Sequence, residues 1–241
     1  MYSSTNRLFC NFYKGPFYRT ITFMGNLVKD FLLKRKKRIL ILLYFIVFTV
    51  FFYLIEHVWI AGHYHVLDTP LDHAIPFIPA FVLPYYFWFA YHVWALLPLF
   101  IDDDPGEYYR TAFALFSGMT VFIIVSIIFP NTQTLRPAHL GKDIFSKMIG
   151  AIYSADTPTN IMPSIHVYNA LIANTAICRR AKKYHRAWES ALSVFCCVMI
   201  ILATLFIKQH TLYDLLGAAP MYIVFYYLFF KKFRLPGFLK E

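Results

Sequence analysis

Three short polar segments interrupt an otherwise apolar chain of 241 residues, and each contains residue types that could do chemistry. They are TLRPAH, with Arg136 and His139; NIMPSIH, with Ser164 and His166; and KQHTLYD, with Lys208, Gln209, His210 and Asp214. Imidazoles, a hydroxyl and cations in such segments suit the binding and transfer of an anionic group.

His210 and Asp214 are four residues apart, a spacing that would place them on one face of a helix. A carboxylate beside an imidazole fixes its tautomer and stabilises its positive charge when the other nitrogen bonds to an electrophile. The alternative is an ion pair that caps the last apolar run. Against it, a buried aspartate at the end of a lipid-facing helix is costly unless it faces the bundle interior.

Pro163 suits the first position of a helix, where its missing N–H costs nothing. Ser164 and the following backbone N–H groups would then lie at a positive helix end, which is an anion site, with His166 in the same turn. The alternative is a plain helix start with a solvated histidine.

Arg136 offers a planar fork suited to phosphate oxygens, and Lys208 could add a second cation. Either could instead be an interfacial anchor that snorkels to the membrane surface. Together with the helix end and the two imidazoles, one as nucleophile and one as acid, these residues predict phosphoryl transfer. We expect no metal, since no carboxylate cluster accompanies them.

Composition indicates a polytopic membrane protein rather than a soluble or disordered chain. Hydrophobic residues make up 59%, aromatic residues 20% and charged residues only 15%. The net charge is +10, and the basic residues cluster beside apolar runs, which favours an anionic leaflet over nucleic acid as the partner. The four cysteines have neither zinc-site nor disulfide-framework spacing, and we expect no cofactor.

Six apolar runs are near the length that crosses a bilayer, and we expect all six to be helices. They are 39–60, 79–100, 111–129, 163–178, 189–207 and 212–230, the fourth being short and polar at its start. Basic clusters at 34–38, 179–186 and 231–234 then fall on one side, which the positive-inside rule makes the cytoplasm. Both termini would be cytoplasmic, as would the acidic loop 101–110, and the three polar segments would lie on the opposite face.

We therefore expect an all-α, six-transmembrane-helix bundle that forms a single domain over 1–241. Residues 1–38 would be a cytoplasmic basic N-terminal segment containing an interfacial helix, 39–230 the six-span core, and 231–241 a cytoplasmic tail. The outer side would receive 61–78, a long loop at 130–162 and a short turn at 208–211. Residues 141–155 have apolar residues at near-helical spacing, which predicts a helix along the outer interface. The oligomeric state is left open.

The three segments resemble the type 2 phosphatidic acid phosphatase superfamily, whose pattern is KxxxxxxRP, then PSxH, then SRxxxxxHxxxD. This sequence supplies RP at Arg136, PSIH ending at His166, and HxxxD from His210 to Asp214. The resemblance implies a membrane lipid phosphatase of six spans that covers nearly the whole chain. It also implies roles: His210 as nucleophile, Asp214 orienting it, His166 protonating the leaving lipid alkoxide, and phosphate held by Arg136 and the Ser164 region.

The sequence departs from the family pattern at several positions. Phe129 stands where the family has lysine, and Ala203 and Thr204 where it has SR. Lys142, Lys147 or His139 could supply lost charge. Ile165 replaces the usual glycine of PSGH, which looks more like the inositol phosphorylceramide synthase branch.

Three functions stay open at this point. The first is metal-independent hydrolysis of a lipid phosphomonoester or diphosphate through a phosphohistidine. The second is transfer of a phospho-head group to a lipid alcohol by the same histidine chemistry. The third is a non-enzyme, such as a haem-binding electron carrier or a lipid transporter that uses some of the nine histidines.

Overall fold

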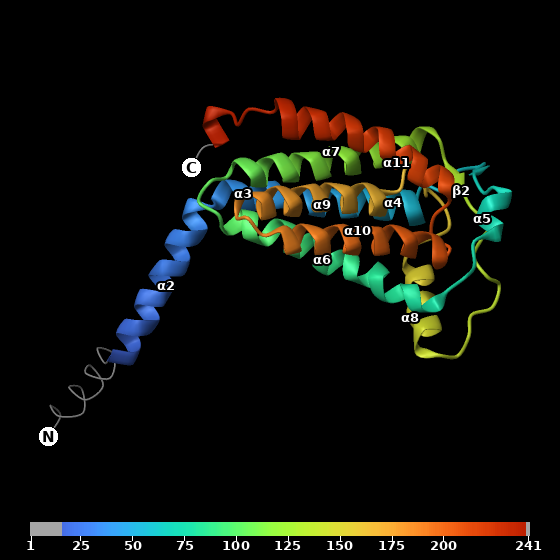
Figure 1. Cartoon of the computed structure of the whole chain (residues 1–241), viewed down its shortest axis with the longest axis horizontal. Coiled ribbons are helices and arrows are strands. Elements are labelled where there is room, and N and C mark those ends of the chain that lie inside the picture. The colour runs from blue at the N-terminus through green and yellow to red at the C-terminus, as the bar shows by residue number, and fades with distance from the viewer. Residues whose placement is uncertain (1–15, 240–241) are drawn as a thin grey trace, which may run out of the picture. The chain divides into compact units, whose positions relative to one another are not determined.

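The computed structural model describes residues 16–239 and contains almost only helices (Figure 1). Its contacts divide the chain into two compact units, with the boundary between residues 41 and 42. The boundary falls close to the predicted start of the first span at residue 39. The all-helical prediction is confirmed.

The first unit consists of α2 (Pro16–Lys34) and the start of α3 (Lys36–Leu42). Along α2, apolar residues recur every three to four positions, so one side of the helix is apolar and the other polar. From Thr20 to Lys34 all of these side chains are exposed within the structure. A helix was expected within residues 1–33, of which 1–15 lie outside the described residues.

Five helical segments are long and apolar enough to cross a lipid bilayer, as expected for an integral membrane protein. Two of them are single helices, α7 (Gly106–Ile128) and α10 (Ala187–Phe206). The other three each join two elements. Lys36–His57 joins α3 to α4 (Tyr44–His57), Pro79–Ile101 joins η1 (Pro79–Phe81) to α6 (Val82–Ile101), and Leu212–Lys232 joins α11 (Leu212–Phe225) to the π-helical η2 (Tyr226–Lys232). A short 3₁₀ turn, η3 (Gly237–Leu239), follows. The five segments overlap five of the six predicted runs.

The sixth predicted run, 163–178, corresponds to α9 (Ile165–Lys183), which has 19 residues against 20–23 in the five apolar segments and is more polar. It packs against α6, α7, α10 and α11, as its central place among the ribbons in Figure 1 indicates. Small residues let these helices approach closely, among them Ala170, Ala173 and Ala176, which are almost fully buried. Since α9 is covered by other helices, its polar residues face protein rather than lipid.

One close contact sets the separation of α7 and α9. Gly118 of α7 lies flat against the ring of Tyr168 of α9, so that a Cβ at position 118 would fall 2.0 Å from that ring. The Tyr168 hydroxyl donates to the carbonyl of Ala114, one turn earlier on α7, at 2.7 Å. The ring therefore occupies the space that the missing side chain leaves.

The loops predicted for the outer side meet at one end of the second unit. The strand β1 (His65–Val66) pairs in parallel with β2 (Asn131–Thr132), and Thr132 also bridges to Thr159. The short helix α5 (Pro70–Ala74) lies in the first loop, and its buried Asp72 accepts a hydrogen bond from the N–H of Leu212 at 2.8 Å. The predicted interfacial helix is α8 (Ile144–Ala155), which begins at an Asp143 cap and packs its apolar face on α6 and α10.

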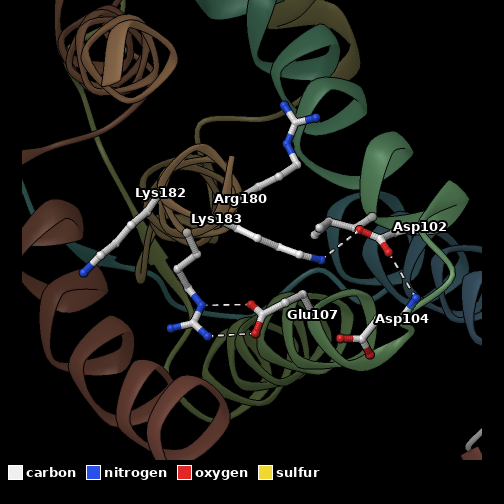
Figure 2. Close-up of a pocket in the computed structure, with 8 residues that line it drawn as sticks. Asp102, Asp104, Glu107, Arg180, Lys182 and Lys183 are labelled. Carbon is white, nitrogen blue, oxygen red and sulfur yellow. Dashed lines mark hydrogen bonds and ion pairs between the residues drawn. The ribbon is translucent and has the colours of Figure 1, made fainter. Parts of the chain in front are cut away.

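At the opposite end, the acidic loop between α6 and α7 meets the basic end of α9. Arg179 binds Glu107 through two hydrogen bonds of 2.8 and 2.7 Å, and Figure 2 shows Lys183 reaching Asp102, at 3.4 Å. Together with Leu99 and other charged side chains, these pairs line a pocket of about 330 Å³. Arg179 also lies over the Phe230 ring, which brings the end of η2 to the same end of the bundle. Two acids of this loop are therefore paired with the neighbouring basic cluster.

Substituting Gly118 with alanine should destabilise the protein. The new methyl group would displace Tyr168 and weaken its hydrogen bond to Ala114, at a cost of about 1–3 kcal/mol as for other overpacked sites. Gly150→Ala in α8 is the matched control, because its Cβ would meet only Leu140 at 3.6 Å. Thermal unfolding in detergent should show a lower midpoint for Gly118→Ala alone. Equal midpoints for both variants would contradict the close packing of α7 on α9.

Candidate functional site

A chain of three side chains links α9 to the start of α11. Nδ1 of His166 lies 3.2 Å from Nε2 of His210, and Nδ1 of His210 lies 3.2 Å from Oδ2 of Asp214. His210 and Asp214 are buried, with 6% and 0% of their surfaces exposed. The structure thus brings together the three residues to which the sequence assigned catalytic roles.

His210 and Asp214 do not meet across one helix face, and that prediction is wrong. His210 lies before the helix, Thr211 is the N-cap of α11, and Asp214 is its third residue. The Thr211 hydroxyl accepts from the Asp214 N–H, and Asp214 Oδ2 accepts from the Thr211 N–H at 2.7 Å. This capping box fixes the carboxylate, and the extended N-cap turns His210 back towards it.

When both imidazoles are neutral, the contacts with Asp214 and between the rings fit one placement of their protons. An ionised carboxylate only accepts, so the proton of neutral His210 must be on Nδ1, facing Asp214. Nε2 of His210 then carries a lone pair, and Nδ1 of His166 carries the proton of the bond between the rings. The two facing atoms are then the acceptor and the donor of one hydrogen bond.

Ser164 is the N-cap of α9, and Ile165 is the first helical residue. Its hydroxyl accepts from the Val167 N–H at 3.3 Å, and its own N–H donates to the Asp214 carbonyl at 3.2 Å. Pro163 lies outside the helix, two residues before Ile165, so the prediction of proline at the first helical position is wrong. The helix still starts next to the contact between His166 and His210. The N–H groups of its first turn have no partner within the helix.

Aromatic residues of α6 enclose His166. The rings of Tyr85 and Trp88 each have their centroid 4.8 Å from that of His166, and Nε1 of Trp88 donates to the His166 carbonyl at 3.1 Å. Neither ring was expected at this site from the sequence. The helical spacing of three residues, which puts both rings on one side of α6, was the available signal.

Arg136 binds backbone carbonyls at the end of α8. Its Nη1 donates to the Asp156 carbonyl at 2.9 Å, and its Nη2 donates to the Thr157 carbonyl at 3.0 Å and to Oε1 of Gln209 at 2.5 Å. The guanidinium stacks over the Tyr153 ring, and burial lowers the pKa of Arg136. Arg136, which the sequence predicted to bind phosphate, therefore holds the loop after α8 in place next to Gln209 and His210.

Lys208 is also bound by protein groups. Its Nζ donates to the carbonyls of Asp72 and Ile75, at 2.6 and 2.5 Å, and so holds the end of α5. Burial lowers the pKa of Lys208. The predicted role in binding phosphate would require this ammonium group to exchange its carbonyl partners.

Glu56, in the otherwise apolar α4, holds the loop that leads to His166. It is 6% exposed, and its carboxylate accepts from the Thr157 N–H at 3.3 Å, from the Thr157 hydroxyl, and from Nδ2 of Asn160 at 3.1 Å. The peptide between residues 156 and 158 is thus held by Glu56 on one side and Arg136 on the other. The sequence signal was present, because an acid inside an apolar span is costly unless it is paired.

Several buried polar atoms around the two histidines have no hydrogen-bond partner within residues 16–239. They include Nε of Arg136, Nε2 of Gln209 and Oδ1 of Asp214. Such atoms are rare in folded proteins and indicate a place for water or a polar ligand. Asp156 adds an acidic group that interacts electrostatically with His210 and Arg136, and burial raises its pKa.

The departures from the family pattern lie in apolar or exposed surroundings. Phe129 stacks on the His65 ring at 4.5 Å, and Ala203 and Thr204 are fully buried in α10. Ile165 packs with Ile55, Phe122 and Ile123 of α4 and α7. The alternative sources of charge, His139, Lys142 and Lys147, have exposed side chains.

Within the described part of the chain, no group of three or more histidine, cysteine or acidic residues could hold a metal ion. Comparison of the chain with protein-family models, curated proteins and solved structures finds no match.

Glu56→Gln should loosen the loop at 156–162. An amide offers one acceptor oxygen where the carboxylate serves three donors, and losing a hydrogen bond to a buried charged group costs about 1.5–3 kcal/mol. Hydrogen exchange measured by mass spectrometry should speed up in this segment by about tenfold or more, following the same energy.

Glu107→Gln is the control, because it breaks the ion pair with Arg179 at the other end of the bundle. It should leave exchange at 156–162 unchanged. Unchanged exchange in Glu56→Gln as well would show that the loop does not depend on this carboxylate.

Proposed function

We propose that the protein is a membrane lipid phosphate phosphatase that works through a phosphohistidine without a metal. The observation that carries this proposal is the chain of contacts from Asp214 through His210 to His166. Its two facing nitrogens differ in protonation as a nucleophile and a general acid must.

The reaction would begin when a lipid phosphate enters between the imidazoles and replaces their mutual hydrogen bond. Nε2 of His210 attacks phosphorus, and the bond from phosphorus to the lipid oxygen breaks. His166, which has become an imidazolium by taking the proton of the bound phosphate monoanion, gives its Nδ1 proton to that oxygen and becomes neutral. Asp214 stabilises the positive charge that develops on His210. His166, now a base, takes a proton from water; the resulting hydroxide attacks phosphorus, and the bond to His210 breaks to release inorganic phosphate.

The unpartnered donors support binding of the phosphate oxygens. Nε of Arg136 and Nε2 of Gln209 are buried beside the histidines, and Gln209 is bonded to Arg136 and adjacent to His210 in sequence. Ser164 contributes by starting α9, whose first N–H groups and dipole favour an anion. Lys208 would add positive charge behind this set rather than direct contact.

The surroundings favour a lipid over a soluble phosphate ester. The histidine pair lies at one end of a bundle with five helices apolar enough for a bilayer, and α9 would be the sixth span. The basic residues of α9 and the end of η2 gather at the other end. By the positive-inside rule that end is cytoplasmic, so both termini would face the cytoplasm and the active site the opposite side.

A lipid phosphotransferase remains the second candidate, because a phosphohistidine can pass its phosphoryl group to any alcohol that reaches it. The bulky Ile165, which prompted this alternative, packs into an apolar cluster of α4 and α7. Its side chain therefore gives no specific support for an alcohol acceptor over water.

Substitution of the three central residues should abolish turnover while leaving the fold intact. His210→Ala removes the nucleophile, and His166→Ala and Asp214→Asn should each lower the rate by about 10²–10⁴-fold, as for other general acids and their orienting carboxylates. The measurement is release of phosphate from lipid phosphates in detergent micelles. An alkali-stable ³²P adduct should form on the wild type and be absent from His210→Ala.

His73→Ala is the matched control, because its imidazole is exposed and pairs with Asp68 in the outer loop. This variant should retain wild-type turnover. Near-normal activity in His210→Ala would refute the mechanism.

Adding a lipid alcohol distinguishes the two candidate reactions. The purified protein is incubated with a labelled lipid phosphate, or with a phospholipid whose phospho-head group is labelled, with and without diacylglycerol or ceramide. Each reaction is repeated in the presence of EDTA. We expect labelled inorganic phosphate as the sole product and an unchanged rate with EDTA. A labelled second lipid would favour the transferase, and loss of the rate with EDTA would overturn the metal-free mechanism.

A further inference from the structure

We infer that α2 is an in-plane membrane helix whose exposed apolar side seats on the anionic leaflet next to the first span. This inference concerns the N-terminal unit and does not depend on the proposed reaction.

The apolar side of α2 is continuous over three turns. Its members are separated by three or four residues and are 36–60% exposed: Ile21, Met24, Leu27, Val28, Phe31 and Leu32. An amphipathic helix of this pattern lies with its apolar face in the boundary between head groups and acyl chains. Left in water, the same face would be an exposed apolar patch of the kind that marks an interaction surface.

The net positive charge of α2 and α3 favours binding to anionic lipids. From Pro16 to Leu42 the sequence has seven basic residues and one acidic residue, Asp30. In helical projection Lys29 and Lys34 lie on the two edges of the apolar side. From such positions the long lysine side chains can extend to the lipid head groups. Basic segments next to a span are attracted to anionic lipids of the cytoplasmic leaflet.

Chain connectivity supplies the location. The helix α2 ends at Lys34, and the first apolar segment begins at Lys36, so only Arg35 separates them. One residue spans less than about 4 Å, which ties the end of α2 to the membrane surface. Binding is then intramolecular and needs no high protein concentration.

The test uses the full chain reconstituted in vesicles of phosphatidylcholine alone or with 30% phosphatidylglycerol. In a background without the four natural cysteines, a fluorophore is placed at Leu27→Cys on the apolar side or at Asn26→Cys on the polar side. With anionic lipid we expect doxyl-lipid quenching at position 27, and at least threefold greater iodide quenching at position 26. Lys29→Glu with Lys34→Glu should reduce the protection of position 27 severalfold, whereas Lys142→Glu in the outer loop should not.

Three results would overturn the inference. They are equal iodide quenching at positions 26 and 27, protection at position 27 that is the same in both lipids and insensitive to salt, and protection that disappears at one protein per vesicle. The last would identify a second copy of the chain, rather than lipid, as what covers α2.

Discussion

The buried hydrogen bonds from the Asp214 carboxylate through His210 to His166 constrain the rest of the bundle. Two imidazoles and a carboxylate can remain inside a protein only if each polar atom has a partner of the right kind. That requirement fixes the start of α11, where the capping box orients the Asp214 carboxylate. It also fixes the start of α9, where the Ser164 hydroxyl accepts a hydrogen bond from the Val167 N–H and the Ser164 N–H donates to the Asp214 carbonyl. Two helix ends far apart in sequence are thereby locked together.

The neighbouring loop is held by opposite charges from elsewhere in the chain. Glu56 contributes acceptors from α4, and Arg136 contributes donors from the loop after β2, so that the peptide after α8 is fixed from both sides. Glu56 accepts from one backbone N–H and from two neutral side chains, and Arg136 donates to backbone carbonyls and to Gln209. The two charges therefore fix the same short peptide from opposite sides.

The sequence predicted the apolar helices and the three polar segments well, because both depend on local patterns of residue type. The approach of His166 to His210 followed from the order of the segments and their shared end of the bundle. The geometry of His210, however, depends on an N-cap rather than on helical spacing, and this could not be read from four-residue periodicity alone. Glu56 and Tyr85 had local signals, an acid inside an apolar run and ring spacing along one side of a helix, and Gln209 lies in a polar segment. Which groups these three side chains contact depends on tertiary packing, which no single-sequence pattern specifies.

The polarity of α9 has a consequence for biogenesis. As the proposed sixth span, it carries Asn169, Asn174 and Thr175, whose side chains are buried or half-buried against other helices. Among the long helices described in the second unit, α9 is not one of the five apolar segments. Such a segment partitions poorly from the translocon into lipid by itself. Its close packing with α10 means that the two helices would enter the bilayer as a hairpin, with the apolar partner carrying the polar one. Insertion of the helix that begins beside His166 would then await the synthesis of α10, which contributes none of the three central side chains of the site.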